Sequence, residues 1–343
     1  MRNLATFARK HWLTGIFVLL IAVTWAVVIM ASGTPPLAGF LMILQGTFSD
    51  KIALFSTLNI MVPLMLLAIA VAVPGWTGTW NIGGEGQFML GAMVAAWVGA
   101  VLPLNQGLLC VAVALVLSAA AGLVWASWAG ALKTRFNINE IVTTLMANYV
   151  ATLFVSWLVN YPLKAAGSAW AQTAVIRDPF KIPPIVKGTQ FSITFFVALA
   201  VVVFFQYFRR RFKKGYEFTI TGSNERFARI GGVSVGGVRL LSMLMGGAAA
   251  GLAGGLVVLG NAYRMKEGIS PGFGFTGLLV CLLAANDPVA IIVISFLFAV
   301  IQMGSLNLQL LTDIPVEIGG VLQVVLILYV AAFRMLTGRK GRA

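Results

Sequence analysis

Residues 57–73 read TLNIMVPLMLLAIAVAV, an apolar run that leads into the glycine-rich stretch PGWTGTWNIGGEGQ at 74–87. A helix needs about 20 residues to cross the hydrocarbon core of a bilayer. Comparable runs recur along the chain, and they are continuous rather than alternating, which favours helices over barrel strands. We therefore predict an all-α fold, a polytopic transmembrane helical bundle in which residues 1–343 form one transmembrane domain.

The composition supports a membrane protein. Hydrophobic residues make up 59% of the 343 residues and charged residues only 10%, whereas a soluble chain carries roughly 25% charged residues. A soluble fold of this size would lack the charge to cover its surface. Lipid removes that requirement, because lipid-facing surface can be apolar.

About ten spans are predicted, and the boundaries allow eight or nine as alternatives. The candidate spans are 13–31, 57–73, 87–102, 107–130, 140–161, 190–208, 238–260, 271–285, 288–304 and 318–334. With ten spans, both termini lie in the cytoplasm, which makes residues 1–12 a cytoplasmic tail, 162–189 an external loop and 209–237 a cytoplasmic loop. The run from Leu13 to Met30 exceeds the length of a signal h-region, so we interpret it as an uncleaved anchor.

The basic residues support this orientation. The net charge is +14, and the lysines and arginines gather in short segments between apolar runs, as the positive-inside rule predicts. Seven of them fall on the external side: Lys51, Lys164, Arg177, Lys181, Lys187, Arg264 and Lys266. This placement makes nucleic acid an unexpected partner.

The stretch 74–87 breaks the helical pattern with five glycines and a proline, yet apolar spans flank it closely. It carries Asn81, Glu85 and Gln87. Irregular backbone at membrane depth persists only where protein buries it or water wets it. Two interpretations stay open: a polar kink that lines a translocation path, or a cytoplasmic turn.

A row of polar residues lies on the predicted helix 140–161. Asn139 is a candidate cap, and Glu140, Thr144, Asn148 and Thr152 recur at intervals of four residues, on one face of an otherwise apolar helix. Polar groups within a span usually face the bundle interior or a wet cavity. We expect a cavity lining, with hydrogen bonding between helices as the alternative.

The cytoplasmic loop 209–237 contains a predicted short helix at about 225–230. Ser223 or Asn224 can cap it, and Gly231 with Gly232 can end it. Phe227 and Ile230 would give this helix an apolar surface for docking. The basic run before it is explained by membrane topology alone, because basic residues keep a loop in the cytoplasm.

Two further patterns specify packing. Gly247, Gly251 and Gly255 repeat at intervals of four, which lets another helix approach closely, either within the chain or at a subunit contact. Asp287 before Pro288 is a strong helix start.

Several chemistries are excluded by the residues themselves. The sequence contains no phosphate-binding loop of the Gly-xxxx-Gly-Lys-Ser/Thr type. Its single histidine, His11, and its two separated cysteines, Cys110 and Cys281, supply no catalytic triad and no zinc motif. We expect no catalytic residues, no metal and no cofactor in this chain. Acidic residues deep in the spans are few, which argues against ion-coupled transport.

These motifs together resemble a known family of permeases. The stretches NIGGEGQ at 81–87, FNINEIVTTLMANY at 136–149 and GFGFTG at 272–277 are similar to the nucleoside and simple-sugar branch of the branched-chain amino acid and ribose superfamily of bacterial ABC importers. Gly222, Asn224, Ala228 and Gly231 match the spacing of that superfamily's cytoplasmic loop, which contacts the ATPase. The resemblance covers roughly residues 55–335.

The resemblance implies partners and a mechanism. It implies two ABC ATPase subunits that hold the ATP, a second permease (identical or paralogous), an external solute-binding protein and the bacterial inner membrane. Asn81, Glu85, Gln87, Glu140, Thr144 and Asn148 become the predicted solute path. Gly222, Asn224, Phe227, Ala228 and Gly231 become the predicted ATPase-coupling residues. Trp170, Arg177 and Asp178 are candidates for docking the binding protein.

The expected cargo is a nucleoside, moved by alternating access, with a simple sugar next. An ion-coupled secondary transporter is the rival class, and a membrane scaffold without transport is the third.

Overall fold

The computed structural model describes residues 19–27, 29–30, 33–312 and 315–338. The described chain is mostly helical. Its α-helices are α2 (Pro36–Phe48), α3 (Lys51–Gly75), α4 (Gly84–Val101), α5 (Gly107–Phe136), α6 (Glu140–Asn160), α7 (Thr194–Arg211), α8 (Lys213–Ser223), α9 (Glu225–Ile230), α10 (Val235–Val257), α11 (Phe273–Ala284), α12 (Pro288–Leu311) and α13 (Ile318–Gly338). A 3₁₀ turn covers Asp178–Phe180 and a π-helical turn covers Val258–Ala262.

Within these residues, five helices are long and apolar enough to cross a membrane, namely α3, α5, α6, α10 with its π turn, and α12. The shorter α2 and α11 are also apolar. Each predicted span from 57 to 334 coincides with one helix between α3 and α13. The predicted tail 1–12 and residues 13–18, 28 and 31 of the predicted span 13–31 lie outside the described residues, and the described part of that span, residues 19–27 and 29–30, is helical.

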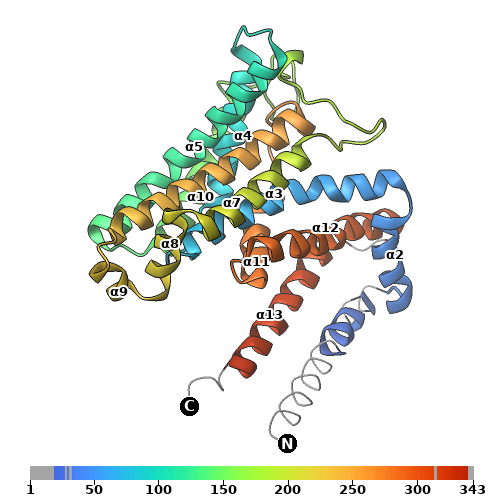
Figure 1. The fold of residues 1–343 in the computed structure, drawn as a ribbon. Coiled ribbons are helices and arrows are strands. Elements are labelled where there is room, and N and C mark those ends of the chain that lie inside the picture. The colour runs from blue at the N-terminus through green and yellow to red at the C-terminus, as the bar shows by residue number, and fades with distance from the viewer. Residues whose placement is uncertain (1–18, 28, 31–32, 313–314, 339–343) are drawn as a thin grey trace, which may run out of the picture. The chain divides into compact units, whose positions relative to one another are not determined.

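The chain divides into two compact units, residues 58–295 and residues 1–57 with 296–343. In the larger unit, α10 lies alongside α4 and α5 (Figure 1). The predicted glycine row makes this possible. Gly247 and Gly251 pack against Gly122 of α5, and Gly255 packs against Ser118. The row therefore serves packing within the chain.

Gly91 of α4 packs on the other side of Gly251, and Gly254 packs on the backbone of Phe88. Small residues let the backbones of α4, α5 and α10 approach so closely that a Cβ atom would collide with a neighbouring main chain. The second half of α3 is buried on all sides, with every residue from Leu64 to Val73 at most 1% exposed, as expected of a helix that is apolar all round.

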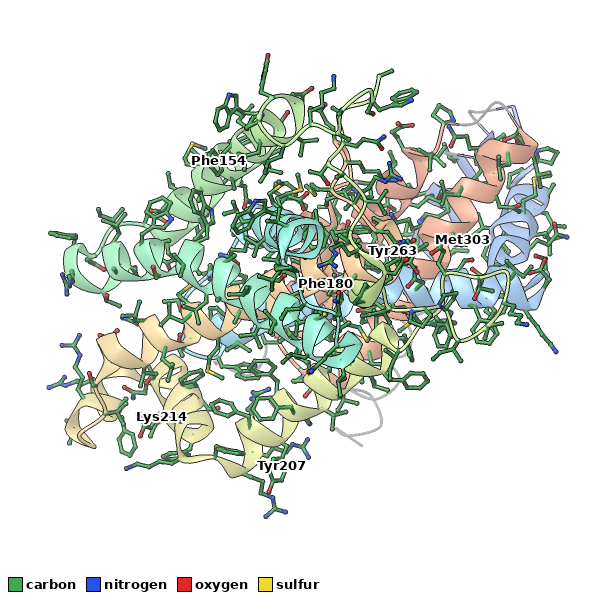
Figure 2. All side chains as sticks on the ribbon, turned by 90° about the horizontal axis from the view of Figure 1, so that it is seen from above. Phe154, Phe180, Tyr207, Lys214, Tyr263 and Met303 are labelled. Atoms are coloured by element: carbon green, nitrogen blue, oxygen red, sulfur yellow. The ribbon has the colours of Figure 1, made fainter. Side chains whose placement is uncertain are left out.

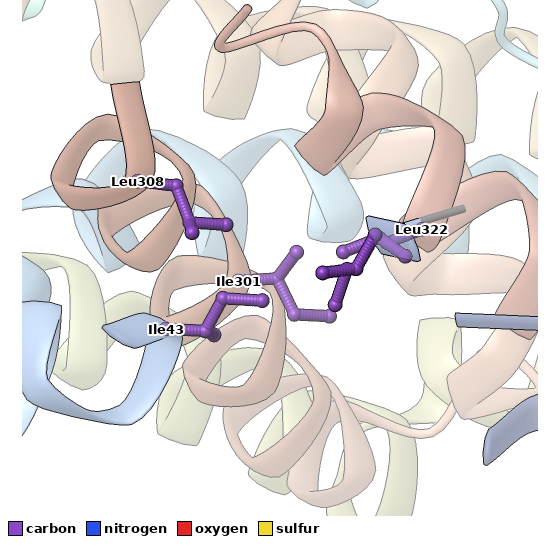
Figure 3. Packing of buried hydrophobic residues seen from close by; sticks show 5 residues of the cluster. Ile43, Ile301, Leu308 and Leu322 are labelled. Carbon is purple, nitrogen blue, oxygen red and sulfur yellow. The ribbon is translucent and has the colours of Figure 1, made fainter. Parts of the chain in front are cut away.

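In the smaller unit, α2 packs against α12 and α13. Ile43, Ile301, Leu308 and Leu322 form a buried apolar cluster with Ile29 (Figure 3). Gly46 lies directly on Gly304, and the Asn307 side-chain amide donates to the Met42 carbonyl at 2.8 Å.

Two helices were not predicted from the sequence. One is α2. The other is α8, which occupies much of the segment predicted as the loop 209–237. Glycine, threonine and charged residues gave its sequence a loop-like composition, yet Gly215 lies against the Phe208 backbone and Phe218 is fully buried with its ring 5.6 Å from that of Phe208. Packing on α7 therefore outweighs the weak helical propensity.

The predicted external segment is irregular but well connected. The amides of Ile176 and Ile182 donate to the carbonyls of Tyr263 and Leu259 at the end of α10, at 2.9 and 2.8 Å. Phe180 of this segment is fully buried (Figure 2). Arg177 donates to the Leu102 carbonyl at 2.7 Å.

Candidate functional site

A break in the helical backbone lies between α3 and α4, at residues 76–83. Pro74 does not stop α3, which continues to Gly75. Proline has no N–H, however, so the carbonyl four residues earlier loses its helical partner. That carbonyl belongs to Ala70, and it accepts a hydrogen bond from the Asn81 side-chain amide at 3.2 Å. Asn81, which lies in the break, thus satisfies the carbonyl that Pro74 leaves without a hydrogen-bond donor in α3.

Asn81 also pairs with Gln87 on the first turn of α4. Each amide donates to the oxygen of the other at 3.0 Å, and both side chains are buried. The Asn81 oxygen accepts the Gly83 N–H as well, at 3.0 Å. Two buried amides therefore satisfy each other while they fix the turn that starts α4, as buried polar groups require.

The polar row of α6 holds the same segment from the other side. Asn148 accepts the Gly86 N–H at 2.8 Å and donates to the Ile82 carbonyl at 2.7 Å. Thr144 accepts the Ile82 N–H at 3.2 Å and donates to the Glu140 carbonyl at 2.6 Å. Both polar groups of the Ile82 backbone are thus served by side chains of α6. Thr152, the fourth member of the row, is exposed.

The two acidic residues of the predicted path point elsewhere. Glu140 forms an ion pair with Lys133 at 3.0 Å, between the end of α5 and the start of α6, and the predicted Asn139 cap accepts the Ile141 N–H at 2.9 Å. Glu85 accepts the Gly274 N–H at 2.6 Å, on the first turn of α11. A carboxylate at this position complements the positive end of a helix.

Asn81, Gln87, Thr144 and Asn148 therefore form one hydrogen-bonded group around the break, which we call the amide cluster. Glu85 and Glu140 connect its edges to neighbouring helices. The contacts are of the kind expected for hydrogen bonding between helices. A role in the solute path stays a prediction for all six residues.

Helix α11 lies alongside the break. The start of α11 meets Glu85, and just past its end the Asn286 carbonyl accepts the Trp76 indole N–H at 2.8 Å. The 12 residues of α11 rise about 18 Å. Most residues of the break are buried, as irregular backbone among apolar helices requires, whereas Gly78 and Trp80 are exposed.

The Trp76 end of the break touches α8. A Cβ atom at Gly222 would collide with the Trp76 carbonyl and would lie 3.0 Å from the Gly78 nitrogen. The Arg209 guanidinium lies over the Trp76 ring at 5.2 Å. The end of α8 and the beginning of the break are therefore in direct backbone contact.

The predicted short helix is present as α9, with the predicted bounds. Asn224 caps it by accepting the Phe227 N–H at 3.0 Å. Gly232, at φ 78°, takes the left-handed position after it, and Gly231 lies between. Ala228 is fully buried, whereas Phe227 and Ile230 are 58% and 79% exposed. The exposed surface of α9 thus carries two apolar side chains, Phe227 and Ile230, beside the exposed Arg226 and Arg229.

Ion pairs hold α9 to the start of α10. Glu225 accepts hydrogen bonds from Arg229 at 2.6 Å and from Arg239 at 2.9 Å. The hydrogen bond from Arg229 is the largest cause that lowers the pKa of Glu225 below its usual value; burial opposes it, and the hydrogen bond from Arg239 and the charges of both arginines lower the pKa further. Glu225 therefore keeps its charge, and the ion pairs fix the direction in which α9 presents its apolar surface.

The predicted docking residues of the external segment are only partly available. Trp170 is 78% exposed. Asp178 is also exposed and pairs with Lys181 at 2.6 Å, and its pKa is lowered by the hydrogen bond and the charge of that lysine. Arg177 is committed to the Leu102 carbonyl and to the Asn105 side-chain oxygen, the latter at 3.0 Å.

Sequence reasoning missed a cavity of about 340 Å³ in the larger unit. Its lining includes Asn59, Gln190, Asn261 and Phe273. None of the six residues of the predicted solute path lines it. The sequence nevertheless contains a signal for this cavity. Asn59 stands four residues before Pro63, and proline has no N–H to bond the carbonyl of the residue four positions earlier.

The long apolar helices, the buried break and the capped α9 define a multi-pass membrane protein of the transporter class. The chain belongs to the family of the branched-chain amino acid transport system permease component, whose model matches residues 53–331. This match confirms the resemblance inferred from the sequence motifs.

Relatives cover most of the chain. The guanosine ABC transporter permease protein of Bacillus subtilis is 30% identical over 321 residues, which cover 92% of each chain. The glucose ABC transporter permease protein of Haloferax volcanii is 31% identical, with 88% of this chain and 82% of that protein covered. The nucleoside ABC transporter permease protein of Lactococcus lactis is 26% identical, with 89% and 86% covered.

Proposed function

We propose that this chain is the permease subunit of an ABC importer for nucleosides in a bacterial inner membrane. ATP is hydrolysed on two separate subunits, and alternating access moves the solute. The contact between Gly222 and the Trp76 backbone carries the proposal, because it joins α8 and α9 to the buried break without an intervening side chain. A second permease and an external solute-binding protein complete the assembly.

The route of coupling follows from the contacts. A partner that binds the exposed Phe227 and Ile230 displaces α9, and the Glu225 ion pairs transmit this displacement to α10. Through Gly222 the same displacement reaches Trp76 and the break. The amide cluster then transfers it to α4 and α6, because its hydrogen bonds resist sliding of the break past either helix.

The experiment is reconstitution of the complete transporter in proteoliposomes, with uptake and ATP hydrolysis measured together. The double substitution Phe227→Ala with Ile230→Ala is expected to abolish both solute-stimulated hydrolysis and uptake, since it removes the apolar docking surface. Asn224→Pro is expected to uncouple them, because φ is −155° at this position and proline requires about −65°. Leu153→Ala, at a position 71% exposed on α6, is the matched control.

Uptake driven by an ion gradient in liposomes that lack the ATPase subunits would overturn the proposal in favour of a secondary transporter. Full coupling in the Phe227 and Ile230 double variant would overturn the assigned role of α9.

The cargo is tested by competition. The names of two relatives indicate nucleosides and a third indicates glucose, so simple sugars are the second candidate. Uptake of labelled guanosine and uridine, with unlabelled glucose as competitor, separates the two. Uptake of glucose with no uptake of either nucleoside would assign the chain to sugars.

A further inference from the structure

The cavity in the larger unit lies where four elements meet. The first half of α3 contributes Asn59, Ile60, Val62 and Pro63, and the segment before α7 contributes Gln190. The end of α10 with its π turn contributes Asn261, and the following irregular segment and α11 contribute Lys266, Ile269 and Phe273. All these residues belong to residues 58–295, so the cavity is formed within a single compact unit.

Three side-chain amides reach the cavity, those of Asn59, Gln190 and Asn261. Unlike the amides around the break, none of them is hydrogen-bonded to another described residue. Each amide supplies donors and an acceptor. The cavity therefore presents several unused hydrogen-bonding groups of both kinds.

Proline adds a further acceptor. Pro63 has no N–H, so the Asn59 carbonyl lacks the helical partner that it would otherwise have four residues later. The equivalent carbonyl before Pro74, that of Ala70, is satisfied by Asn81. At Asn59 the loss of this helical partner thus coincides with a lining position of the cavity.

Other parts of the lining are a π-helical turn and an aromatic ring. Asn261 lies in the π turn Val258–Ala262, a rare conformation found frequently at functional sites. Gly260 of this turn packs against Thr194, which also lines the cavity. The Phe273 ring is held by an edge contact with Phe88, with the ring centroids 6.0 Å apart.

The charge of the lining restricts the ligand. Among its residues Lys266 is the one charged side chain, and it is exposed. A cationic solute would meet no carboxylate, and an anion would meet a single solvated ammonium group. A volume of about 340 Å³ lies in the range of small-molecule pockets, from about 300 Å³ upward.

We propose that this cavity is a solute-binding site for a neutral molecule that carries hydroxyl or amide groups and a flat ring, such as a nucleoside. The site rests on the proposed transport function and specifies where the cargo is held. Asn59, Gln190 and Asn261 bind the polar edges of the solute, and Phe273 stacks on its ring.

The cysteines of the chain permit a direct test. Cys110 and Cys281 are both fully buried, so a cysteine introduced by Asn261→Cys can be labelled selectively with a membrane-impermeant maleimide. Lys187→Cys supplies the matched control, because Lys187 is exposed and does not line the cavity. The complete reconstituted transporter is labelled with guanosine, uridine or glucose present, and uptake of each solute is measured in the same preparation.

We expect the transported solute to slow labelling at position 261 at least fivefold and to leave labelling at position 187 unchanged. Phe273→Leu is expected to weaken protection by guanosine about tenfold, as loss of a stacking contact predicts. Its effect on protection by glucose is expected to be much smaller.

The outcomes separate the two proposals. A solute that is taken up but does not protect position 261 overturns the site and leaves the transport function intact. Equal protection at positions 187 and 261 overturns it too, because a general change of accessibility would then explain the effect. If the unsubstituted transporter takes up none of the three solutes and none protects position 261, the proposed cargo and the site both fail.

Discussion

The two places where amide side chains gather in the larger unit are built in opposite ways. In the amide cluster, Asn81, Gln87 and Asn148 use their groups on one another and on the backbone of the break. In the cavity, Asn59 and Asn261 have no such partner among the described residues. A proline follows the asparagine or carbonyl concerned in each place, and Asn81 satisfies the Ala70 carbonyl that Pro74 leaves without its helical partner. The difference distinguishes groups that hold the structure from groups free for a ligand.

The largest effect on stability is expected from Asn81→Leu, and it is compared with the same substitution at Asn59. Asn81→Leu leaves the Ala70 carbonyl, the Gly83 N–H and the Gln87 amide without their partner in a buried site. Each such loss costs about 1–3 kcal/mol, so we expect a fall in unfolding free energy of roughly 2–4 kcal/mol after local relaxation. Thermal unfolding in detergent, with monodispersity as a second readout, measures it.

Asn59→Leu is the matched variant in the cavity. It removes no hydrogen bond within the described chain, so stability is expected to change by less than about 0.5 kcal/mol while uptake falls. Equal destabilisation by the two leucines would show that the comparison is wrong and that Asn59 is also structural.

The next effect concerns the other end of the break, where backbone meets backbone. Gly222→Ala places a methyl group against the Trp76 carbonyl, and overpacking of this kind costs about 1–3 kcal/mol. We expect a moderate loss of stability together with ATP hydrolysis that no longer drives uptake.

The control for this variant is Gly236→Ala on α10, where the nearest atom to a Cβ is 3.9 Å away, in Thr134. Alanine in an open helical position is expected to be neutral or slightly stabilising. Normal coupling in Gly222→Ala would remove the α8 contact from the proposed route.

A smaller effect is expected at the junction of α4 and α11. Glu85→Gln keeps the shape of the side chain but removes the charge that receives the Gly274 N–H. Loss of a charge-assisted bond at a helix start predicts a cost of about 1 kcal/mol. Chemical denaturation of the purified protein measures it, and an unchanged midpoint would mean that the charge is not needed there.

Much of this arrangement could be predicted from the sequence, for identifiable reasons. Apolar runs locate helices α3 to α7 and α10 to α13, because burial in lipid depends on local composition. Local capping is also predictable: Asn224 starts α9, and Asp287 accepts the Ala290 N–H at 3.0 Å. The face shared by Glu140, Thr144 and Asn148 followed from helical periodicity, and all three side chains are buried.

The partners of these residues could not be predicted. Nothing local indicates that Asn148 binds the backbone of Ile82, 66 positions away, or that Gly222 touches Trp76. For the same reason the cavity escaped notice, because Asn59 and Asn261 are isolated polar residues until α3 and α10 are brought together. Sequence patterns predict which residues share a helix face, whereas tertiary packing decides which amide side chains are hydrogen-bonded within the fold.

The smallest effect is expected at the rim of the cavity, next to Lys266. Glu267 accepts hydrogen bonds from Ser156 at 2.7 Å and from Asn160 at 3.3 Å, and these bonds, in that order, lower its pKa below the ordinary value of 4.5. Because the folded-state pKa is depressed, the stabilising contribution is present above pH 4.5 and is lost as pH falls through the lower folded-state value. We expect hydrogen exchange in residues 263–272, measured relative to the intrinsic rate at the same pH, to accelerate as pH falls, with the amide cluster unaffected. Glu267→Gln should remove this pH dependence, and exchange that accelerates equally in the variant would assign it to another group.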